Sequence, residues 1–279
     1  MASGGFFVFK SMGKKEREGA MNTEQAIRTR NSTRSFLDRQ VDPGLLRYIL
    51  ELSMLAPSGC NIQPYRIALA SGDHWKKISQ ELVRLADTTP LSHEISWSLD
   101  YPERYKKRQR ETGFGLYRTL KIAREDREKR RKQFLKNFSA FGAPGVVFVF
   151  ADREVGGYAI LDLGIWMQTF MLAAHAKGLS TVPLTSLAAY PSTIRGHFNV
   201  PEYMALACAI AYGYADPDDD VNTYRPGRVP LEEIMLEARE PESNSITSPR
   251  ARICPSQHNF SGTRDEHPPC CKAPSQSSL

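Results

Sequence analysis

The sequence predicts an α+β fold, and three observations support this class. Residues 146–150 form a continuous run of β-branched and aromatic side chains, which is typical of a fully buried central strand, and residues 206–212 form a second apolar run. Residues 161–177, between the two runs, have apolar side chains at helical spacing. Helices and strands do not alternate regularly along the chain. We therefore expect a few buried strands covered by several helices.

The N-terminal region contains clear helix signals. Asp42, Pro43 and Gly44 open a helix, and Pro57 with the residues after it must end that helix near Ala56. The other elements expected before residue 88 are a helix over 23–30 opened by Thr23, an extended segment over 31–41, a strand over 65–70, a turn over 71–73 and a helix over 75–86.

The middle of the chain is less regular. Residues 88–140 are the least regular part, and residues 118–137 within them predict one long, highly charged helix. The apolar helix 161–177 should end at Gly178 and be buried on most sides, either within one subunit or against a second copy. The remaining elements expected are a short helix over 193–198, an acidic loop over 216–220 and a last helix over 231–238.

Composition divides the chain into three parts. Residues 1–22 predict a flexible N-terminal extension, and residues 23–238 predict one domain. Residues 239–279 have little apolar content, which predicts a disordered tail. Hydrophobic residues make up 41% of the chain, so the domain can bury a sizeable core.

The positive charge is concentrated in one stretch. Of the formal net charge of +6, residues 103–136 contribute +9, from 14 Lys and Arg against 5 Asp and Glu. A solvated helix face is the favoured interpretation, and attraction of an anionic partner such as a phosphorylated nicotinamide is the alternative. No nucleic-acid-binding motif accompanies the charge, so we expect no nucleic-acid partner.

The cysteines and the absence of targeting signals indicate the compartment. The five cysteines do not form a disulfide framework, and their spacing predicts no metal site. We find neither a signal peptide nor a run of about eighteen apolar residues that could span a bilayer. We therefore expect a cytoplasmic protein without a membrane partner.

Three clusters could carry chemistry. In an extended segment Arg30, Ser32 and Arg34 share one face, which would suit a phosphate because arginines give it charge-assisted, often bidentate bonds. The second cluster is a loop stiffened by prolines that carries two amides, Asn61 and Gln63, which could bind the polar edge of a flavin. The third holds Arg225 and Arg228. Taken singly, the clusters are better explained as surface arginines, an ordinary loop and a solvated linker, in that order.

The order of the three clusters is specific. Arg-x-Ser-x-Arg-x-Phe from residue 30, Ala-Pro-Ser-Gly-x-Asn-x-Gln-Pro from residue 56 and a late Arg-x-x-Arg-x-Pro from residue 225 resemble the nitroreductase family. The motifs at residues 137–144 and 162–179 are similar to its nitrobenzoate-reductase-like branch. The resemblance covers residues 23–238.

The resemblance implies an architecture and a cofactor. The fold would be a central, mostly antiparallel sheet flanked by helices, in a homodimer built around the helix 161–177. FMN would bind at each end of the interface, and residues 88–140 would form a variable lid. The implied FMN-binding residues are Arg30, Ser32, Arg34, Arg225 and Arg228 at the phosphate, Ser58, Asn61 and Gln63 at the ring, Pro57 and Ser58 reaching in from the partner subunit, and Pro183, Leu184 and Thr185 at the reactive edge.

The resemblance also implies a reaction. NADH or NADPH would deliver hydride, leave, and be replaced by a small nitroaromatic or quinone-like acceptor, in a ping-pong sequence. Protons can come from water, so no catalytic side chain is nominated, and His175 is expected to be a packing or interface residue. Two alternatives stay open: a flavoenzyme of the same fold with other chemistry, such as a reductive dehalogenase or a dehydrogenase, and a flavin-binding protein without turnover.

Overall fold

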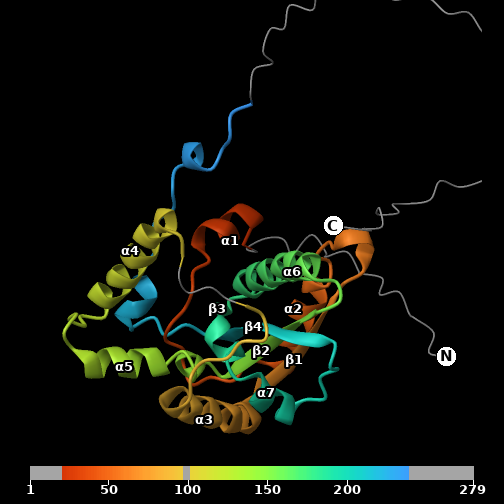
Figure 1. The fold of residues 1–279 in the computed structure, drawn as a ribbon, viewed down its shortest axis with the longest axis horizontal. Coiled ribbons are helices and arrows are strands. Elements are labelled where there is room, and N and C mark those ends of the chain that lie inside the picture. The colour runs from red at the N-terminus through yellow and green to blue at the C-terminus, as the bar shows by residue number, and fades with distance from the viewer. Residues whose placement is uncertain (1–20, 97–100, 239–279) are drawn as a thin grey trace, which may run out of the picture. The chain divides into compact units, whose positions relative to one another are not determined.

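The computed structural model describes residues 21–96 and 101–238 (Figure 1). The predicted N-terminal extension and C-terminal tail lie almost entirely outside these ranges. The chain divides into two units, the first ending at Arg228 and the second beginning at Val229. The described part of the second unit contains a single-turn 3-10 helix, Leu231–Glu233, so the helix predicted over 231–238 is wrong.

Four antiparallel strands form the sheet of the first unit, in the order β1-β2-β4-β3. The predicted strands are confirmed as β1 (Tyr65–Ser71), β2 (Gly145–Asp152) and β4 (Met204–Gly213). Every residue of β4 is buried, as its apolar run predicts. The short strand β3 (Ser180–Leu184) has no counterpart in the prediction. It contains Pro183, which a sheet tolerates because β3 lies at an edge.

Helices cover both faces of the sheet (Figure 1). Alternate residues of β2 point to opposite sides, as the pleat requires. Val146 and Phe148 belong to one core cluster, which includes residues of the helices α3 (Gly72–Thr88) and α7 (Pro191–His197). Val147 and Val149 belong to the other, with residues of α2 (Pro43–Ser53) and α6 (Gly157–Ala176).

The helix α6 confirms the long apolar helix but begins four residues before its predicted start. Gly178 follows with a φ of 79°, the left-handed conformation that favours glycine after a helix. One side of α6 packs against the sheet, with Trp166 and Phe170 fully buried. The other side leaves Tyr158 and Leu161 exposed at 76% and 58%. Among the described helices α6 alone is long and apolar enough to cross a membrane, by length and composition only.

Three details of the N-terminal region differ from the prediction. The helix α1 (Thr23–Thr29) is capped by Asn22, whose side chain accepts from the Gln25 amide, so Thr23 is the first helical residue instead of the cap. The helix α2 has the predicted Asp42 cap, but it ends at Ser53, three residues before Ala56. No separate turn follows β1, because α3 begins directly at Gly72, whose φ is 55°.

The single helix predicted over 118–137 is wrong. The structure has two helices in this region, α4 (Glu103–Thr119) and α5 (Arg127–Leu135). Lys121 adopts a left-handed φ of 54°, which a continuous helix cannot contain. Asp126 then caps α5 by accepting from the Lys129 amide at 2.9 Å. The uniform charge of the stretch concealed this break.

The chain returns to α4 near the end of the first unit. The 3-10 turn η5 (Asp220–Thr223) ends the predicted acidic loop and leads to Tyr224. The Tyr224 hydroxyl donates to the Thr112 carbonyl at 2.9 Å, and its ring lies so close to Gly115 that a Cβ there would come within 2.7 Å of it. The segment that carries Arg225 and Arg228 therefore lies beside α4.

Candidate functional site

The segment after α1 lies along the start of β3. Ser32 forms a parallel bridge with Thr181, and the Thr33 amide donates to the Thr181 carbonyl at 3.1 Å. Thr33 is buried, whereas Arg30, Ser32 and Arg34 are partly exposed, which fits the predicted alternation of an extended segment. The Arg34 guanidinium also donates to the Ser32 carbonyl at 3.2 Å.

Asn222 ties the late segment to this early one. Its side-chain oxygen accepts from the Arg34 amide at 2.8 Å, and its side-chain nitrogen donates to the Ser35 carbonyl at 2.8 Å. Its own carbonyl accepts from the Arg225 guanidinium at 2.7 Å. The first and third motifs, almost two hundred residues apart in sequence, thus lie together in space.

The arginines that meet here are not neutralised. We call Arg30, Arg225 and Arg228 the arginine cluster. Burial and the positive charges of Arg228 and Arg225 lower the pKa of Arg30, and burial lowers the pKa of Arg34. In the described part of the chain, no carboxylate forms an ion pair with any of these four arginines. An uncompensated concentration of guanidinium groups is suited to a dianion such as phosphate.

His175, near the end of α6, belongs to the same site. The Thr29 hydroxyl donates to the Gln25 carbonyl at 2.6 Å, so its oxygen accepts from His175 Nε2, 2.8 Å away. Burial, followed by the charges of Arg30 and Arg225, lowers the pKa of His175 below its ordinary value of 6.5. Sequence reasoning assigned it to packing, because the contact with α1 depends on tertiary structure.

The lowered pKa of His175 gives a pH prediction. The unfolded chain takes up this proton more readily than the folded chain, so the stability contribution is complete above about pH 6.5 and is lost as the pH falls below it. We expect the free energy of unfolding of the anion-free protein to fall between pH 7 and pH 5, and to fall less in His175→Gln. Urea titrations at a series of pH values test this, and equal slopes for both proteins would contradict it.

The second motif forms a strained loop, residues 57–63, which we call the amide loop. Cys60, Asn61 and Gln63 all have positive φ values, of 46°, 58° and 48°. Such conformations cost on the order of 1–3 kcal/mol each in non-glycine residues and are concentrated at functional sites. The Gln63 side chain donates to the Asn61 side-chain oxygen at 2.9 Å, and the Gln63 amide donates to the Ser58 hydroxyl at 3.1 Å.

A buried carboxylate holds the amide loop on α6. Asp162 is 4% exposed, and both of its oxygens lie 3.2 Å from the Gly59 amide. Sequence reasoning used Asp162 only as part of a motif and missed this contact. The amide loop is thus anchored near the start of α6.

One chain does not bring the amide loop and the arginine cluster together. The loop is held at Asp162, and the cluster lies beside His175, thirteen residues further along α6. At 1.5 Å per residue this corresponds to roughly 20 Å along the helix. The two predicted halves of the site therefore lie at opposite ends of α6.

Residues 183–185 are the third predicted contact with the flavin. They lie at the end of the strand that begins beside Ser32, in the predicted phosphate-binding half of the site. The strand β3 begins beside Ser32 and ends at Leu184, which is buried, while Thr185 is exposed. The Thr185 carbonyl accepts from His93 Nε2 at 3.2 Å. Ser186 follows with a buried hydroxyl that has no hydrogen-bond partner in the described structure. The end of β3 therefore combines an exposed turn with an unsatisfied polar atom.

An α+β sheet with an unpaired arginine cluster beside its edge strand defines a protein suited to bind a phosphorylated ligand there, and comparisons with known proteins identify the family. The pattern of the Nitroreductase family matches residues 27–214. The chain is 31% identical over 207 residues to 4-nitrobenzoate reductase of Pseudomonas putida, which covers 74% of this chain and 90% of that protein. The chain therefore belongs to the nitroreductase family, as its motifs predict.

Two solved structures have a similar fold. The FMN and NADPH-dependent nitroreductase NfnB of Sphigopyxis sp. strain HMH is 31% identical, with a TM-score of 0.74, over 79% of this chain and all of that one. The FMN-dependent nitroreductase NfnB of Mycobacterium smegmatis, in complex with NADPH, is 29% identical with the same TM-score, over 77% of this chain and 97% of that one. The predicted fold class and the prediction of a nitroreductase-type enzyme are confirmed.

Proposed function

We propose that this chain is an FMN-dependent nitroreductase that transfers hydride from NADH or NADPH to small nitroaromatic acceptors. The observation that carries the proposal is the meeting of the first and third motifs around an unpaired arginine cluster. Family membership and relatives described as FMN-dependent support the same cofactor. Quinone-like acceptors and a cytoplasmic location stay predictions.

The residues present fit the proposed cofactor. Arg30, Arg225 and Arg228 would bind the phosphate together with Ser32 and Arg34, because only an anion would compensate their charge. The end of β3, at Pro183 and Leu184, and the exposed Thr185 that follows it would lie at the reactive edge of the ring. FMN, when bound, would accept and donate the hydride, while this chain would position the ring and its partners.

We further propose a homodimer in which each cofactor site uses both subunits. A two-fold axis near the middle of α6 would bring the amide loop of one subunit to the arginine-cluster end of the other. The apolar side chains that stay exposed around this face support the pairing. They are Leu55, Ile62, Tyr158, Ile160 and Leu161. In this arrangement the whole amide loop would come from the partner subunit, with Asn61 and Gln63 at the polar edge of the ring and Pro57 and Ser58 beside it.

The arrangement needs no side-chain acid or base. The described residues around the end of β3 offer backbone groups, the Ser186 hydroxyl and the His93 ring, whose Nε2 is held on the Thr185 carbonyl. Protons for the reaction can come from water, so we assign none of these groups a catalytic role. The nicotinamide and the acceptor would occupy the same place in turn, which predicts ping-pong kinetics.

The proposal has a direct test. Purified protein is expected to carry a flavin absorption band, to lose it anaerobically on addition of NADH or NADPH, and to regain it when 4-nitrobenzoate is added. Double-reciprocal plots of the initial rate against nicotinamide concentration, measured at several acceptor concentrations, would give parallel lines for the ping-pong sequence. A flavin band that no nicotinamide bleaches would favour a flavin-binding protein without turnover, and absence of bound flavin would reject the cofactor.

A further inference from the structure

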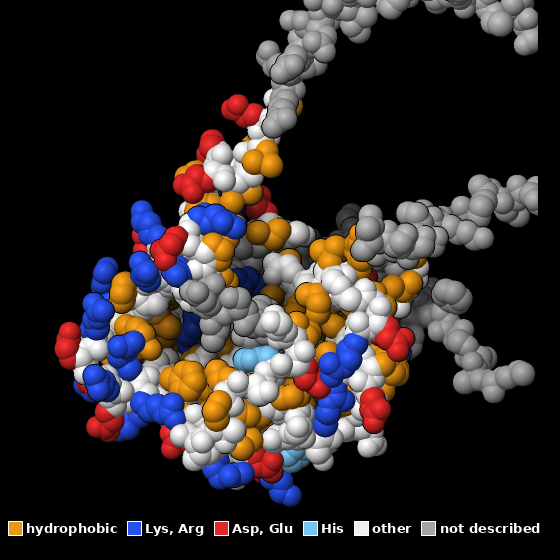
Figure 2. All heavy atoms as spheres, viewed as in Figure 1, with side chains coloured by type: hydrophobic (Ala, Val, Ile, Leu, Met, Phe, Trp, Pro, Cys, Tyr) orange, Lys and Arg blue, Asp and Glu red, His pale blue; other side chains and the backbone are white. Residues whose placement is uncertain are grey.

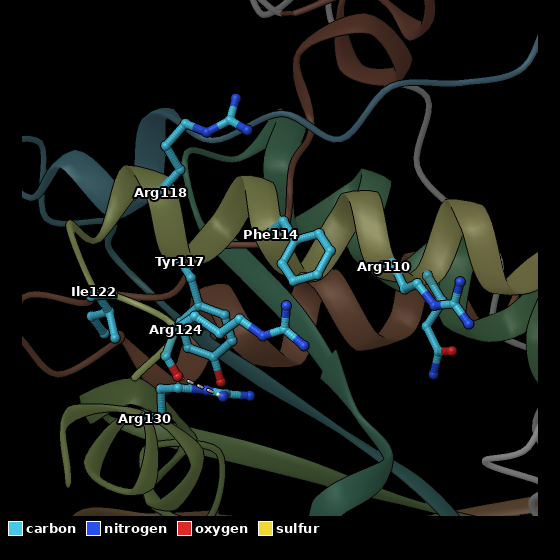
Figure 3. Close-up of a pocket in the computed structure, with 10 residues that line it drawn as sticks. Arg110, Phe114, Tyr117, Arg118, Ile122, Arg124 and Arg130 are labelled. Carbon is cyan, nitrogen blue, oxygen red and sulfur yellow. Dashed lines mark hydrogen bonds between the residues drawn. The ribbon is translucent and has the colours of Figure 1, made fainter. Parts of the chain in front are cut away.

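The basic stretch of the lid region encloses a pocket that the proposed flavin site does not use. A cavity of about 710 Å³ lies between α4 and α5 (Figure 3). Its lining contains four arginines, two aromatic rings and no acidic side chain. The lining residues used below are Arg110, Phe114, Tyr117, Arg118, Arg124 and Arg130. We call this cavity the α4–α5 pocket.

The centre of the α4–α5 pocket pairs rings with guanidinium groups. Arg130 lies 5.3 Å from the centre of the Tyr117 ring and donates to the Arg124 carbonyl at 3.1 Å, so its position is fixed from two sides. Figure 3 shows Arg124 extending beside Tyr117 and toward Phe114, whereas Arg118 points away from this centre. Phe114 is 52% exposed, so its ring is accessible to a ligand in the pocket.

The charges at the α4–α5 pocket differ from others in the same basic stretch. Lys129 and Lys132 on α5 each form an ion pair with a carboxylate of their own helix, and Arg131 pairs with Asp87 at 2.6 Å. Within the described residues, Arg110, Arg124 and Arg130 have no such partner. In Figure 2 the Lys and Arg side chains gather over α4 and α5, with apolar side chains between them.

This chemistry fits a planar ring that carries an anionic group. Aromatic side chains stack on a flat ring, and guanidinium groups bind carboxylate or phosphate with charge-assisted bonds. The opposite side of α4 contacts Tyr224, so the α4–α5 pocket and the arginine cluster lie on two sides of one helix. The two sites are therefore separate.

We propose that the α4–α5 pocket binds an aromatic or heteroaromatic ring bearing an anionic group, through Arg124, Arg130 and Phe114. One reactant of the proposed function supplies this chemistry away from its reacting ring: NADPH, whose adenosine 2′-phosphate end lies far from the nicotinamide. The inference deepens that function and rests on it for the identity of the ligand. It changes the interpretation of the basic stretch from a solvated helix face to a binding surface.

Binding of the anion to the pocket is measured first, because this measurement does not require catalytic turnover. Adenosine 2′-monophosphate and benzoate are titrated calorimetrically into the FMN-loaded protein, with adenosine and benzamide as uncharged counterparts. We expect adenosine 2′-monophosphate to bind, more weakly at high salt, and Arg124→Ala or Phe114→Ala to weaken this binding about tenfold, the loss of one charge-assisted bond or ring contact. Arg127→Ala, on α5 outside the pocket, is the charge-matched control and should leave binding nearly unchanged.

Steady-state kinetics distinguish the two anions. If Arg124→Ala raises the KM for NADPH and not for NADH, the pocket binds the phosphorylated adenosine. If it raises the KM for 4-nitrobenzoate and not for nitrobenzene, the pocket is part of the acceptor site at the flavin, and the proposal of a separate site is overturned. If neither anion binds, or Arg127→Ala has the same effect as Arg124→Ala, the proposal is overturned. Failure of the flavin to bleach with any nicotinamide would instead reject the proposed function, while the binding titration would still stand.

Discussion

Arg30→Ala combined with Arg228→Ala is expected to give protein that purifies colourless, without bound FMN. The two guanidinium groups come from opposite ends of the first unit and approach closely enough to lower the pKa of Arg30. A charge-assisted hydrogen bond contributes on the order of 1.5–3 kcal/mol, so losing two should weaken FMN binding by roughly 10²- to 10⁴-fold. Titration of flavin-free protein with FMN, followed by fluorescence, measures the change.

In the absence of FMN, the double variant should be at least as stable toward unfolding as the unmutated protein. Removing the partly buried Arg30 and the exposed Arg228, whose positive charges repel each other, relieves a cost that only a bound anion offsets. Arg28→Ala is the matched control on the same helix, because Arg28 is 73% exposed and pairs with Glu24. Such an exposed pair contributes little, so this control should retain its colour. Full FMN occupancy in the double variant would refute the phosphate assignment.

Mixed dimers should recover activity that neither parent has. One parent carries Arg30→Ala with Arg228→Ala, and the other carries Asn61→Gly with Gln63→Gly, which removes both amides while suiting the positive φ values. If each site combines the arginine cluster of one subunit with the amide loop of the other, every mixed dimer contains one intact site. Random mixing gives half mixed dimers, so about a quarter of all sites should bind FMN and turn over.

The result of the mixing experiment separates two geometries. Sites built within one chain would stay defective in every dimer, and mixing would restore nothing. Size-exclusion chromatography of each parent is needed beside it, because a variant that no longer pairs would also fail to complement. Recovery near a quarter of the activity of the unmutated protein would confirm that the roughly 20 Å between the two ends of α6 is bridged by pairing.

Local signals predicted the parts of the fold that local physics decides. The apolar runs of β2 and β4, the Asp42 cap of α2 and the glycine after α6 all follow from adjacent residues. The region of α4 and α5 was mispredicted because charge gives no periodic signal, and β3 was missed because a five-residue edge strand with a proline resembles a loop.

The site was predictable in its residue types but not in its arrangement. The motifs predicted which arginines and amides belong to the site, and the structure brings the first and third motifs together. The roles of His175 and Asp162 could not be predicted, since each depends on a contact with another element that no local pattern records. The division of the site between the two ends of α6 likewise appears only in three dimensions.

The hydrogen bond that the Gly59 amide donates to the Asp162 carboxylate has a mechanical consequence. The loop has a shape that its own residues disfavour, and a carboxylate on a neighbouring helix helps to impose it. The outer side of α6 is exposed and would face the partner subunit in the proposed dimer. A small rotation of α6, caused by different packing against such a neighbour, would be transmitted through one side chain to the backbone of residues 59–63. A substitution that changes the geometry of the dimer interface would then also change the affinity for the flavin ring.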